Sequence, residues 1–213
     1  MRQLTVLLIA LALVAAGPHS PAHAGPPTDQ VKGATDQVLK ILQDPALKPP
    51  DKSPERRKQL RAVVDQVFDW QETGQRALAG HWKPLKPEQR QEFSTLFADL
   101  VERSYVGKIE AYSGEKIAYV GDTIEGNLAT VKTRLVTKSQ PQGIPIDYRL
   151  LQKDGDRWRA YDVLIEGVSL VGNYRSQFNR IVQQSGYDEL IKKMKTKQEE
   201  LTFDETEQGK KKP

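Results

Sequence analysis

The first half of the chain carries apolar residues at helical spacing, in runs separated by proline-rich breaks. The first run begins at Thr28, which we expect to cap a helix, and breaks fall at Pro49-Pro50 and at the segment KPLKP. The helical positions are Val31, Ala34, Val38, Ile41 and Leu42 in the first run, Leu60, Val63, Val64, Val67 and Phe68 in the second, and Phe93, Leu96, Phe97, Leu100, Val101, Tyr105 and Ile109 in the third. This pattern predicts three main helices, with a shorter helical piece before Gly80.

The apolar stripe of the helix that starts at Pro87 is wider than one packing surface requires. Such a stripe is typical of a core helix packed on two sides, or of a helix with one side facing a cavity. Periodicity alone does not decide between the two.

After Gly114 the apolar period changes to two, which is typical of strands. Alternating runs cover residues 116–121, 128–138, 144–152 and 158–166, and Lys153–Asp156 has the Asp-Gly signature of a tight hairpin turn. Strands at hairpin spacing predict an antiparallel meander. Because helices come first, strands next and a long helix last, we predict an α+β fold, with helices packed on one face of a curved, mainly antiparallel four-stranded sheet.

The period returns to helical at Gly167, and the apolar positions are then Val168, Leu170, Val171, Tyr174 and Phe178. We expect Ser169 to cap this helix. Gly186 should interrupt it before a last amphipathic stretch that uses Tyr187, Leu190, Ile191 and Met194.

The two ends of the chain differ from this folded part. Residues 1–24 read as a cleaved signal peptide, with a basic start, an apolar run too short to span a bilayer, and the small-x-small site Ala22-His23-Ala24. Residues 204–213 form a polar tail that we expect to be disordered. One domain is predicted over residues 25–203 of an exported protein, and no stable membrane insertion is expected.

Composition excludes several classes of protein. There is no cysteine, so disulfides, thiolate metal sites and cysteine nucleophiles are excluded. The formal net charge of +4 falls to +3 when Arg2 leaves with the leader, and the charges are interspersed. No basic stripe with interleaved aromatic residues is present, so we expect no nucleic-acid partner.

The sequence motifs contain no recognisable set of catalytic residues. Ser169 lies one position out of register for a Gly-x-Ser-x-Gly nucleophile motif, and His81 is the only histidine left to serve as its base. One histidine and no cysteine leave only carboxylates for a metal, so no metal or other cofactor is expected. Asp162 and Glu166 share a strand face, but we expect Asp162 to bond backbone or arginine groups and Glu166 to end the strand. The sequence therefore predicts a protein that is not an enzyme.

The apolar residues near the predicted sheet leave an alternative open. Ile144, Ile146, Tyr148 and Leu150 alternate on one strand, and Tyr161, Val163 and Ile165 do so on its hairpin partner. Helices across this face could close a dry core or leave a wedge-shaped cavity. The pattern by itself favours the dry core.

Three segments carry a resemblance to a known family. FDW, LAGHWKPLKPEQRQEFSTLFADLVERSY and above all WRAYDVLIEGVSLVGNYRSQF resemble the MlaC family, the toluene-tolerance auxiliary proteins of Gram-negative bacteria. The resemblance extends from about Asp36 to Leu190, which is most of the chain. It implies a monomeric periplasmic carrier that holds a phospholipid by its acyl chains and shuttles it between an outer-membrane lipoprotein complex and an inner-membrane ABC transporter subunit.

The resemblance also changes the expected interior from a dry core to a lipid cavity. The residues expected to line it are Tyr105, Ile109, Tyr148, Leu150, Tyr161, Val163 and Ile165, with Val168, Leu170, Val171 and Tyr174 near the mouth. Arg175 either meets the phosphate of the headgroup or is solvated. The alternatives are a carrier of another apolar envelope molecule, such as a hopanoid or an organic solvent, and a non-catalytic envelope assembly protein.

Overall fold

The structure is a computed structural model that describes residues 25–153, 155 and 157–196. The predicted signal peptide, the polar tail and two residues of the Lys153–Asp156 turn lie outside the described residues. Every element below belongs to the described ranges.

Helices form the first part of the chain, as the apolar periodicity predicts. α1 (Pro26–Gln43) is followed by two 3-10 turns, η1 (Pro45–Leu47) and η2 (Pro50–Lys52), and then by α2 (Ser53–Val67). α3 (Trp70–Leu78) passes through η3 (Ala79–His81) to the long helix α4 (Pro87–Glu110). Proline stands at the start of α1 and α4, where its missing N–H costs no helical hydrogen bond.

The strands form one antiparallel sheet in the order β1-β2-β3-β4-β5. They are β1 (Lys116–Glu125), β2 (Leu128–Val136), β3 (Ile144–Lys153), β4 (Arg157–Ile165) and β5 (Val168–Ser169). The predicted meander and fold class are confirmed. The sheet has five strands rather than four because Val168 and Ser169 pair with Ile165 and Leu164 before the last helix begins.

The last helix, α5 (Leu170–Lys195), contains the predicted interruption. Gly186 has φ 84° and ψ 170°. A positive φ is unfavourable for residues with a side chain, so glycine suits this position. The polypeptide therefore changes direction there, and the final turns carry Leu190, Ile191 and Met194 back onto the other helices.

The first helix begins earlier than the sequence predicts. It starts at Pro26 with Gly25 as its N-cap, and the prediction of Thr28 as the cap is wrong. The Asp122 carboxylate of β1 accepts hydrogen bonds from the Gly25 N–H (2.9 Å), the Thr28 N–H (3.1 Å) and the Thr28 hydroxyl (2.7 Å). A side chain distant in sequence thus accepts hydrogen bonds from the unpaired N–H groups at the start of α1. The local sequence pattern does not reveal such a partner.

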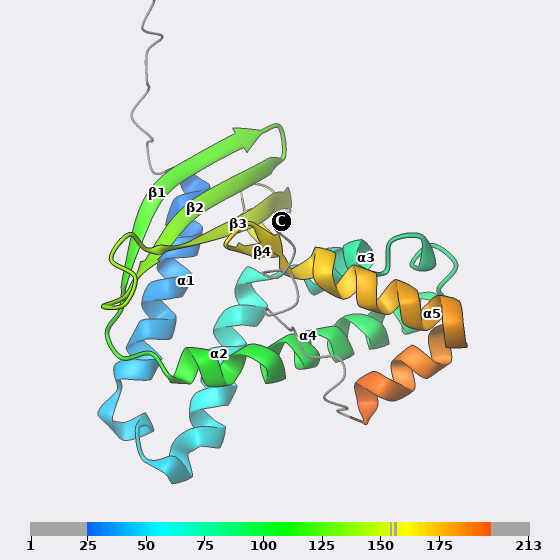
Figure 1. Ribbon diagram of the computed structural model, residues 1–213, viewed down its shortest axis with the longest axis horizontal. Helices are drawn as coiled ribbons and strands as arrows, with labels where there is room; N and C mark the ends of the chain where they lie inside the picture. The colour runs from blue at the N-terminus through cyan, green and yellow to red at the C-terminus, as the bar shows by residue number, and fades with distance from the viewer. Residues whose placement is uncertain (1–24, 154, 156, 197–213) are drawn as a thin grey trace, which may run out of the picture.

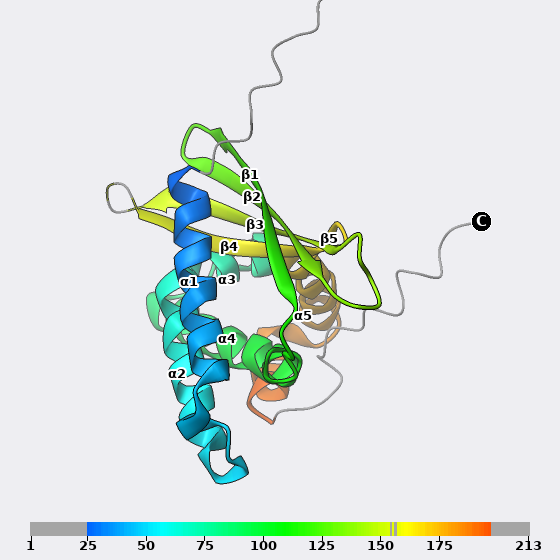
Figure 2. The same ribbon diagram turned by 90° about the vertical axis from the view of Figure 1, so that its left-hand side faces the viewer.

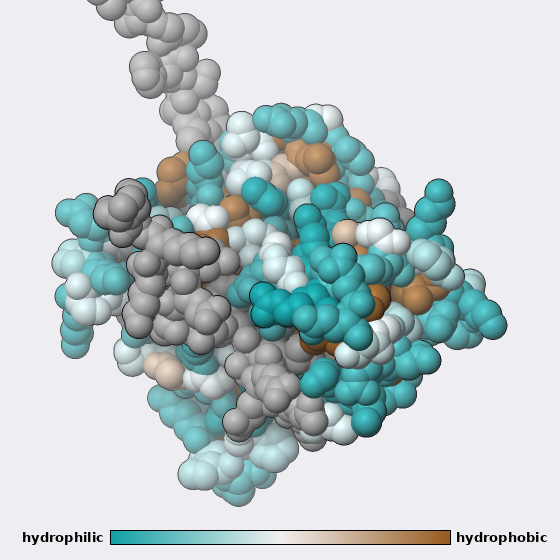
Figure 3. All heavy atoms as spheres, turned by 45° about the vertical axis from the view of Figure 1, so that its right-hand side comes forward, coloured by the Kyte–Doolittle hydropathy of each residue, from teal (hydrophilic) through white to brown (hydrophobic). Residues whose placement is uncertain are grey.

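The helices lie on one side of the sheet, in two groups. Figure 1 shows the sheet at the top with the helices against its lower side, and the turned view in Figure 2 shows the same layering. α1 and α2 pack under the sheet through one hydrophobic cluster, whereas α3, α4 and α5 form a second cluster with each other. The face in Figure 3 is mainly hydrophilic with scattered apolar residues, and no helix in the described ranges is long and apolar enough to cross a bilayer.

Candidate functional site

Two hydrophobic cores with a less buried apolar region between them define the candidate site. The sheet core contains Ala129, Val131, Leu150 and Ala160 under α1. The helical core centres on an aromatic group, Phe93, Phe97, Tyr174 and Phe178, whose ring centroids lie 5.1–5.8 Å apart. The two cores are separate clusters, and the predicted lining residues fall partly within them, partly at their margins and partly outside both.

The strand register places one row that includes predicted lining residues on the face of the sheet that the helices cover. Val131 pairs with Tyr148, which pairs with Val163. Directly opposed residues project from the same face, so these three form one row across the sheet. Val131 is fully buried under α1, whereas Tyr148 and Val163 keep accessible surface.

A second row lies next to the first and is formed by Tyr119, Thr133, Ile146 and Ile165. Thr133 is buried and donates its hydroxyl to the Ile146 carbonyl at 2.7 Å, so the one polar side chain of this row is satisfied. The other three are only half-buried. The helix-covered face therefore changes from tightly buried beneath α1 to partly open away from it.

Tyr148 combines an apolar environment with remaining accessible surface. Burial, followed by the neighbouring Tyr119, raises the pKa of the Tyr148 phenol to about 12. The side chain is nevertheless only half-buried by accessible area. Tyr148 therefore lies at the margin of the sheet core, packed against it on one side.

Among the predicted lining residues on the helices, Tyr105 and Ile109 of α4 are half-buried, whereas Leu170 of α5 belongs to the helical core. Tyr105 is half-buried and packs against the margin of the helical core, with the Lys108 ammonium 5.4 Å from its ring centroid. Ile109 is half-buried, and Leu170 retains 8% of its accessible surface. Val168 in β5 is also half-buried.

Three other predicted lining residues belong to the packed cores. Leu150 and Tyr174 have no accessible surface, and Val171 retains 2%. Tyr174 stacks within the aromatic group, and its hydroxyl lies 3.1 Å from the Ser104 hydroxyl. These side chains support the intermediate zone from behind.

Alternation along β4 does not hold at Tyr161. Leu150 pairs with Ala160 and Arg149 pairs with Asp162, so Tyr161 is the extra residue of a β-bulge. Its ring lies under the Arg76 guanidinium of α3, with the ring centroid 3.8 Å from the guanidinium carbon. Because the bulge interrupts the alternation between Ala160 and Asp162, the strand register does not assign Tyr161 to the row that contains Val163.

The start of α5 is structural and has no nucleophile geometry. Ser169 caps the helix as predicted, its hydroxyl accepting from the Gly172 N–H at 2.8 Å and donating to the Asp162 carboxylate at 2.6 Å. Asp162 bonds backbone and arginine, as expected, through the Val171 N–H and Arg149. Arg175 is exposed and donates to the Arg76 carbonyl.

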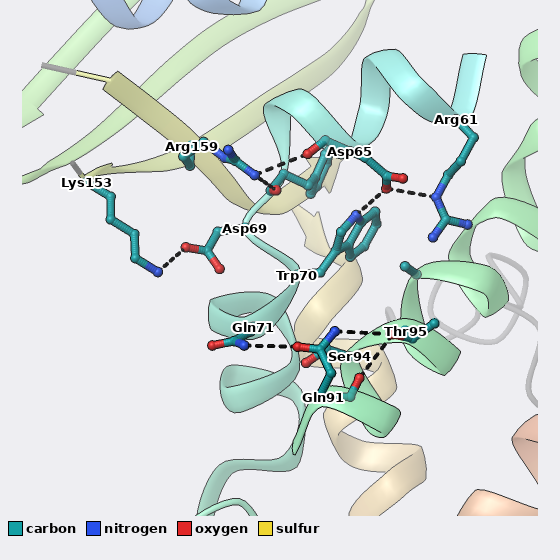
Figure 4. Close-up of a pocket in the computed structure, with 12 residues that line it drawn as sticks. Arg61, Asp65, Asp69, Trp70, Gln71, Gln91, Ser94, Thr95, Lys153 and Arg159 are labelled. Carbon is teal, nitrogen blue, oxygen red and sulfur yellow. Dashed lines mark hydrogen bonds and ion pairs between the residues drawn. The ribbon is translucent and has the colours of Figure 1, made fainter. Parts of the chain in front are cut away.

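A hollow of about 420 Å³ at the junction of α2, α3, α4 and the sheet was not predicted from the sequence. Figure 4 shows that its walls are polar: Lys153 pairs with Asp69 at 2.6 Å, and the Trp70 indole donates to Asp65 at 2.7 Å. Burial would raise the pKa of Asp69, but the hydrogen bonds from Lys153 and from the Glu72 N–H outweigh it, so the pKa is lowered. This lining suits water or polar groups rather than hydrocarbon.

The described residues offer no metal site. Within residues 25–153, 155 and 157–196, no three His, Asp or Glu side chains gather as ligation would require. The histidine within these ranges is His81, and its Nε2 atom lies at 2.9 Å from the side-chain oxygen of Asn179.

Comparisons with known proteins identify the family. A model of the family described as MlaC protein matches residues 32–196. The chain is 27% identical over 125 residues to the intermembrane phospholipid transport system binding protein MlaC of Haemophilus influenzae, an alignment that covers 57% of this chain and 58% of that protein. The fold is shared with a phospholipid-binding protein from Ralstonia solanacearum solved in complex with a phospholipid, at a TM-score of 0.72 and 24% identity, over 83% of this chain and 99% of that one. Since the family model spans most of its length, the chain belongs to the MlaC family.

Proposed function

We propose that this chain is a periplasmic phospholipid carrier and not an enzyme. It would hold acyl chains between the sheet and the helices, and pass lipid between an outer-membrane lipoprotein complex and an inner-membrane ABC transporter. Family membership, the name of the Haemophilus relative and the lipid-bound structure of similar fold support this proposal.

The observation that carries the proposal is the half-buried apolar zone between the two cores. Tyr148, Val163 and Ile165 lie on the covered face of the sheet, yet they are less buried than Val131 and Leu150 beside them. Apolar side chains in the centre of a fold that keep accessible surface are what the wall of a ligand site presents.

Energetics explain why such a wall suffices without catalytic or strongly polar groups. A diacyl lipid carries on the order of thirty methylenes, each worth about 0.8 kcal/mol when removed from water. Unassisted departure from a bilayer would therefore cost roughly 20 kcal/mol or more. An apolar wall of comparable extent offsets this cost, and few headgroup contacts allow the lipid to be released again.

The lining set that we propose is narrower than the one predicted from the sequence. It consists of Tyr105, Ile109, Tyr148, Val163, Ile165, Val168 and Leu170, all of which keep accessible surface. Leu150, Val171 and Tyr174 would support this wall from the packed cores.

A matched pair of substitutions in β4 tests the site. Val163→Arg places a charge on the proposed wall, whereas Leu164→Arg places it on the opposite face of the same strand, where Leu164 is also half-buried. Native mass spectrometry of the protein, purified without its predicted leader and incubated with phospholipid vesicles, should show bound lipid in the wild type and in Leu164→Arg only.

Other results would contradict the proposal in distinct ways. Normal lipid occupancy in Val163→Arg would place the site elsewhere. A wild type that binds a terpenoid or a solvent molecule but no phospholipid would favour the alternative carrier. A wild type that binds none of these would favour a non-catalytic assembly role.

A further inference from the structure

The outer face of β1 and β2 is left uncovered by the helices, whereas on β4 the start of α5 covers Asp162. The sheet residues of the hydrophobic cores, including Ala129, Val131 and Leu150, project from the inner face. In Figures 1 and 2 the helices lie on that same side. The residues that alternate with them therefore face away from the cores.

Cations gather on this outer face. Lys116, Lys132, Arg134 and Arg149, which together we call the cationic face, all project outward by register: Lys132 lies between Gly121 and Asp147, and Arg134 between Ala118 and Pro145. Lys116, Lys132 and Arg134 are exposed, and the Arg149 side chain retains 43% of its accessible surface.

Few acids offset these cations. Asp147 lies beside Lys132 on the same face, Asp162, with 5% of its side chain accessible, pairs with Arg149, and the exposed Glu125 projects outward opposite Leu128 at the β1–β2 hairpin. Within the described residues neither Lys116 nor Lys132 forms an ion pair. Lysine on a strand can protect a sheet edge, but β2 lies between β1 and β3, so edge protection does not account for Lys132 and Arg134.

Exposed apolar side chains accompany the cations. The large hydrophobic residues that are exposed in the described part of the chain are Val120, Ile124 and Leu128, and all three belong to β1 and β2. Of these, Leu128 projects outward opposite Leu151 and Val120 adjoins Gly121, the partner of Lys132, whereas Ile124 pairs with Ala129 and projects from the inner face. Lysine and arginine next to exposed aliphatic groups form the chemistry of reversible binding to an anionic bilayer surface.

We propose that the cationic face rests against anionic phospholipid bilayers in a peripheral contact without insertion. The attraction is to a surface of phosphate groups, so it requires no individually matched acids on a partner, and it weakens as salt shortens the Debye length. This contact goes beyond the carrier function proposed above and does not depend on where the acyl chains are held.

Vesicle sedimentation at low salt tests the contact with matched charge reversals. Lys116→Glu with Lys132→Glu alters the cationic face, whereas Lys40→Glu with Lys58→Glu makes the same change in net charge on exposed positions of α1 and α2. The wild type and the helix variant should sediment with vesicles of equal parts phosphatidylcholine and phosphatidylglycerol. The sheet variant should bind at least about tenfold more weakly, since each lysine near such a surface contributes about fivefold.

Each alternative outcome overturns the proposal. Equal weakening by both variants would show that net charge, not this face, attracts the protein, and equal binding to pure phosphatidylcholine vesicles would exclude electrostatic attraction. Binding of soluble polyglutamate, but not of vesicles, through the same lysines would identify an acidic protein as the occupant. Native mass spectrometry of the two variants reports lipid occupancy separately, so failure here is distinguishable from failure of the carrier proposal.

Discussion

The buried carboxylate of Asp162 connects the sheet to the last helix through three contacts. It accepts hydrogen bonds from the Ser169 hydroxyl and the Val171 N–H and pairs with Arg149 at 3.4 Å. The sequence predicts part of this, namely Ser169 as a helix cap and Asp162 bonded to backbone or arginine groups, but it does not predict the hydrogen bond between these two side chains. The bulge at Tyr161 has no such signal, since it depends on pairing with β3 rather than on local composition.

Replacing this carboxylate should therefore destabilise the protein. Asp162→Ala leaves the Val171 N–H and the Ser169 hydroxyl without their acceptor in a buried setting, at a cost of about 1–3 kcal/mol. Asp162→Asn keeps one acceptor oxygen and should cost less. Urea denaturation measures both, with Asp51→Ala in η2 as an exposed control expected to stay within about 0.5 kcal/mol. Equal stabilities of Asp162→Ala and the control would show that the junction does not need the carboxylate.

At the scale of elements, α2 and α4 contact each other through ion pairs, whereas the neighbouring helices pack through apolar side chains. Glu110 binds Arg56 at 2.7 Å and Arg57 at 2.8 Å, and Arg61 binds Asp99 at 2.9 Å and Glu102 at 2.7 Å. The sequence predicts both helices from their apolar periods. It does not predict their juxtaposition, because charged residues on exposed helix faces fit many arrangements equally well.

The Glu110 pairs should make part of the stability depend on pH. Hydrogen bonding to Arg57, opposed by burial and assisted by Arg56, lowers the pKa of Glu110 below its ordinary 4.5. Its contribution is thus present above the ordinary value and is lost as pH falls through the lowered pKa. Glu110→Gln should be about 1–2 kcal/mol less stable than wild type at neutral pH in urea denaturation.

The difference between Glu110→Gln and the wild type should shrink in strongly acidic buffer, where the wild-type carboxyl is protonated. Glu125→Gln, an exposed change in the β1–β2 hairpin, serves as the control and should leave stability nearly unchanged at either pH. A gap that persisted undiminished in acid would mean that Glu110 acts through packing rather than charge.

At the scale of the whole molecule, the main feature is that the buried apolar side chains form two separate cores. Periodicity identifies most of the side chains that enter them, including the aromatic residues of α4 and α5. It does not reveal that the cores remain separate, because a residue in a packed core and a residue lining a hollow are equally apolar. Tyr148 and Val131 illustrate this limit: they are paired on one face of the sheet, yet only Val131 is fully buried.

Enlarging the side chains on either side of Tyr148 distinguishes a filled interior from a hollow one. Val131→Phe inserts volume into the packed region under α1 and should cost about 1–3 kcal/mol, as overpacking does. Val163→Phe enlarges the other neighbour in the same row, where unfilled space would accept the ring, and should change stability by less than about 0.5 kcal/mol. Urea denaturation of the lipid-free proteins measures the contrast without reference to any ligand. If Val163→Phe proved as costly as Val131→Phe, the zone between the cores would be packed solid, and the acyl chains of a phospholipid would have no place there.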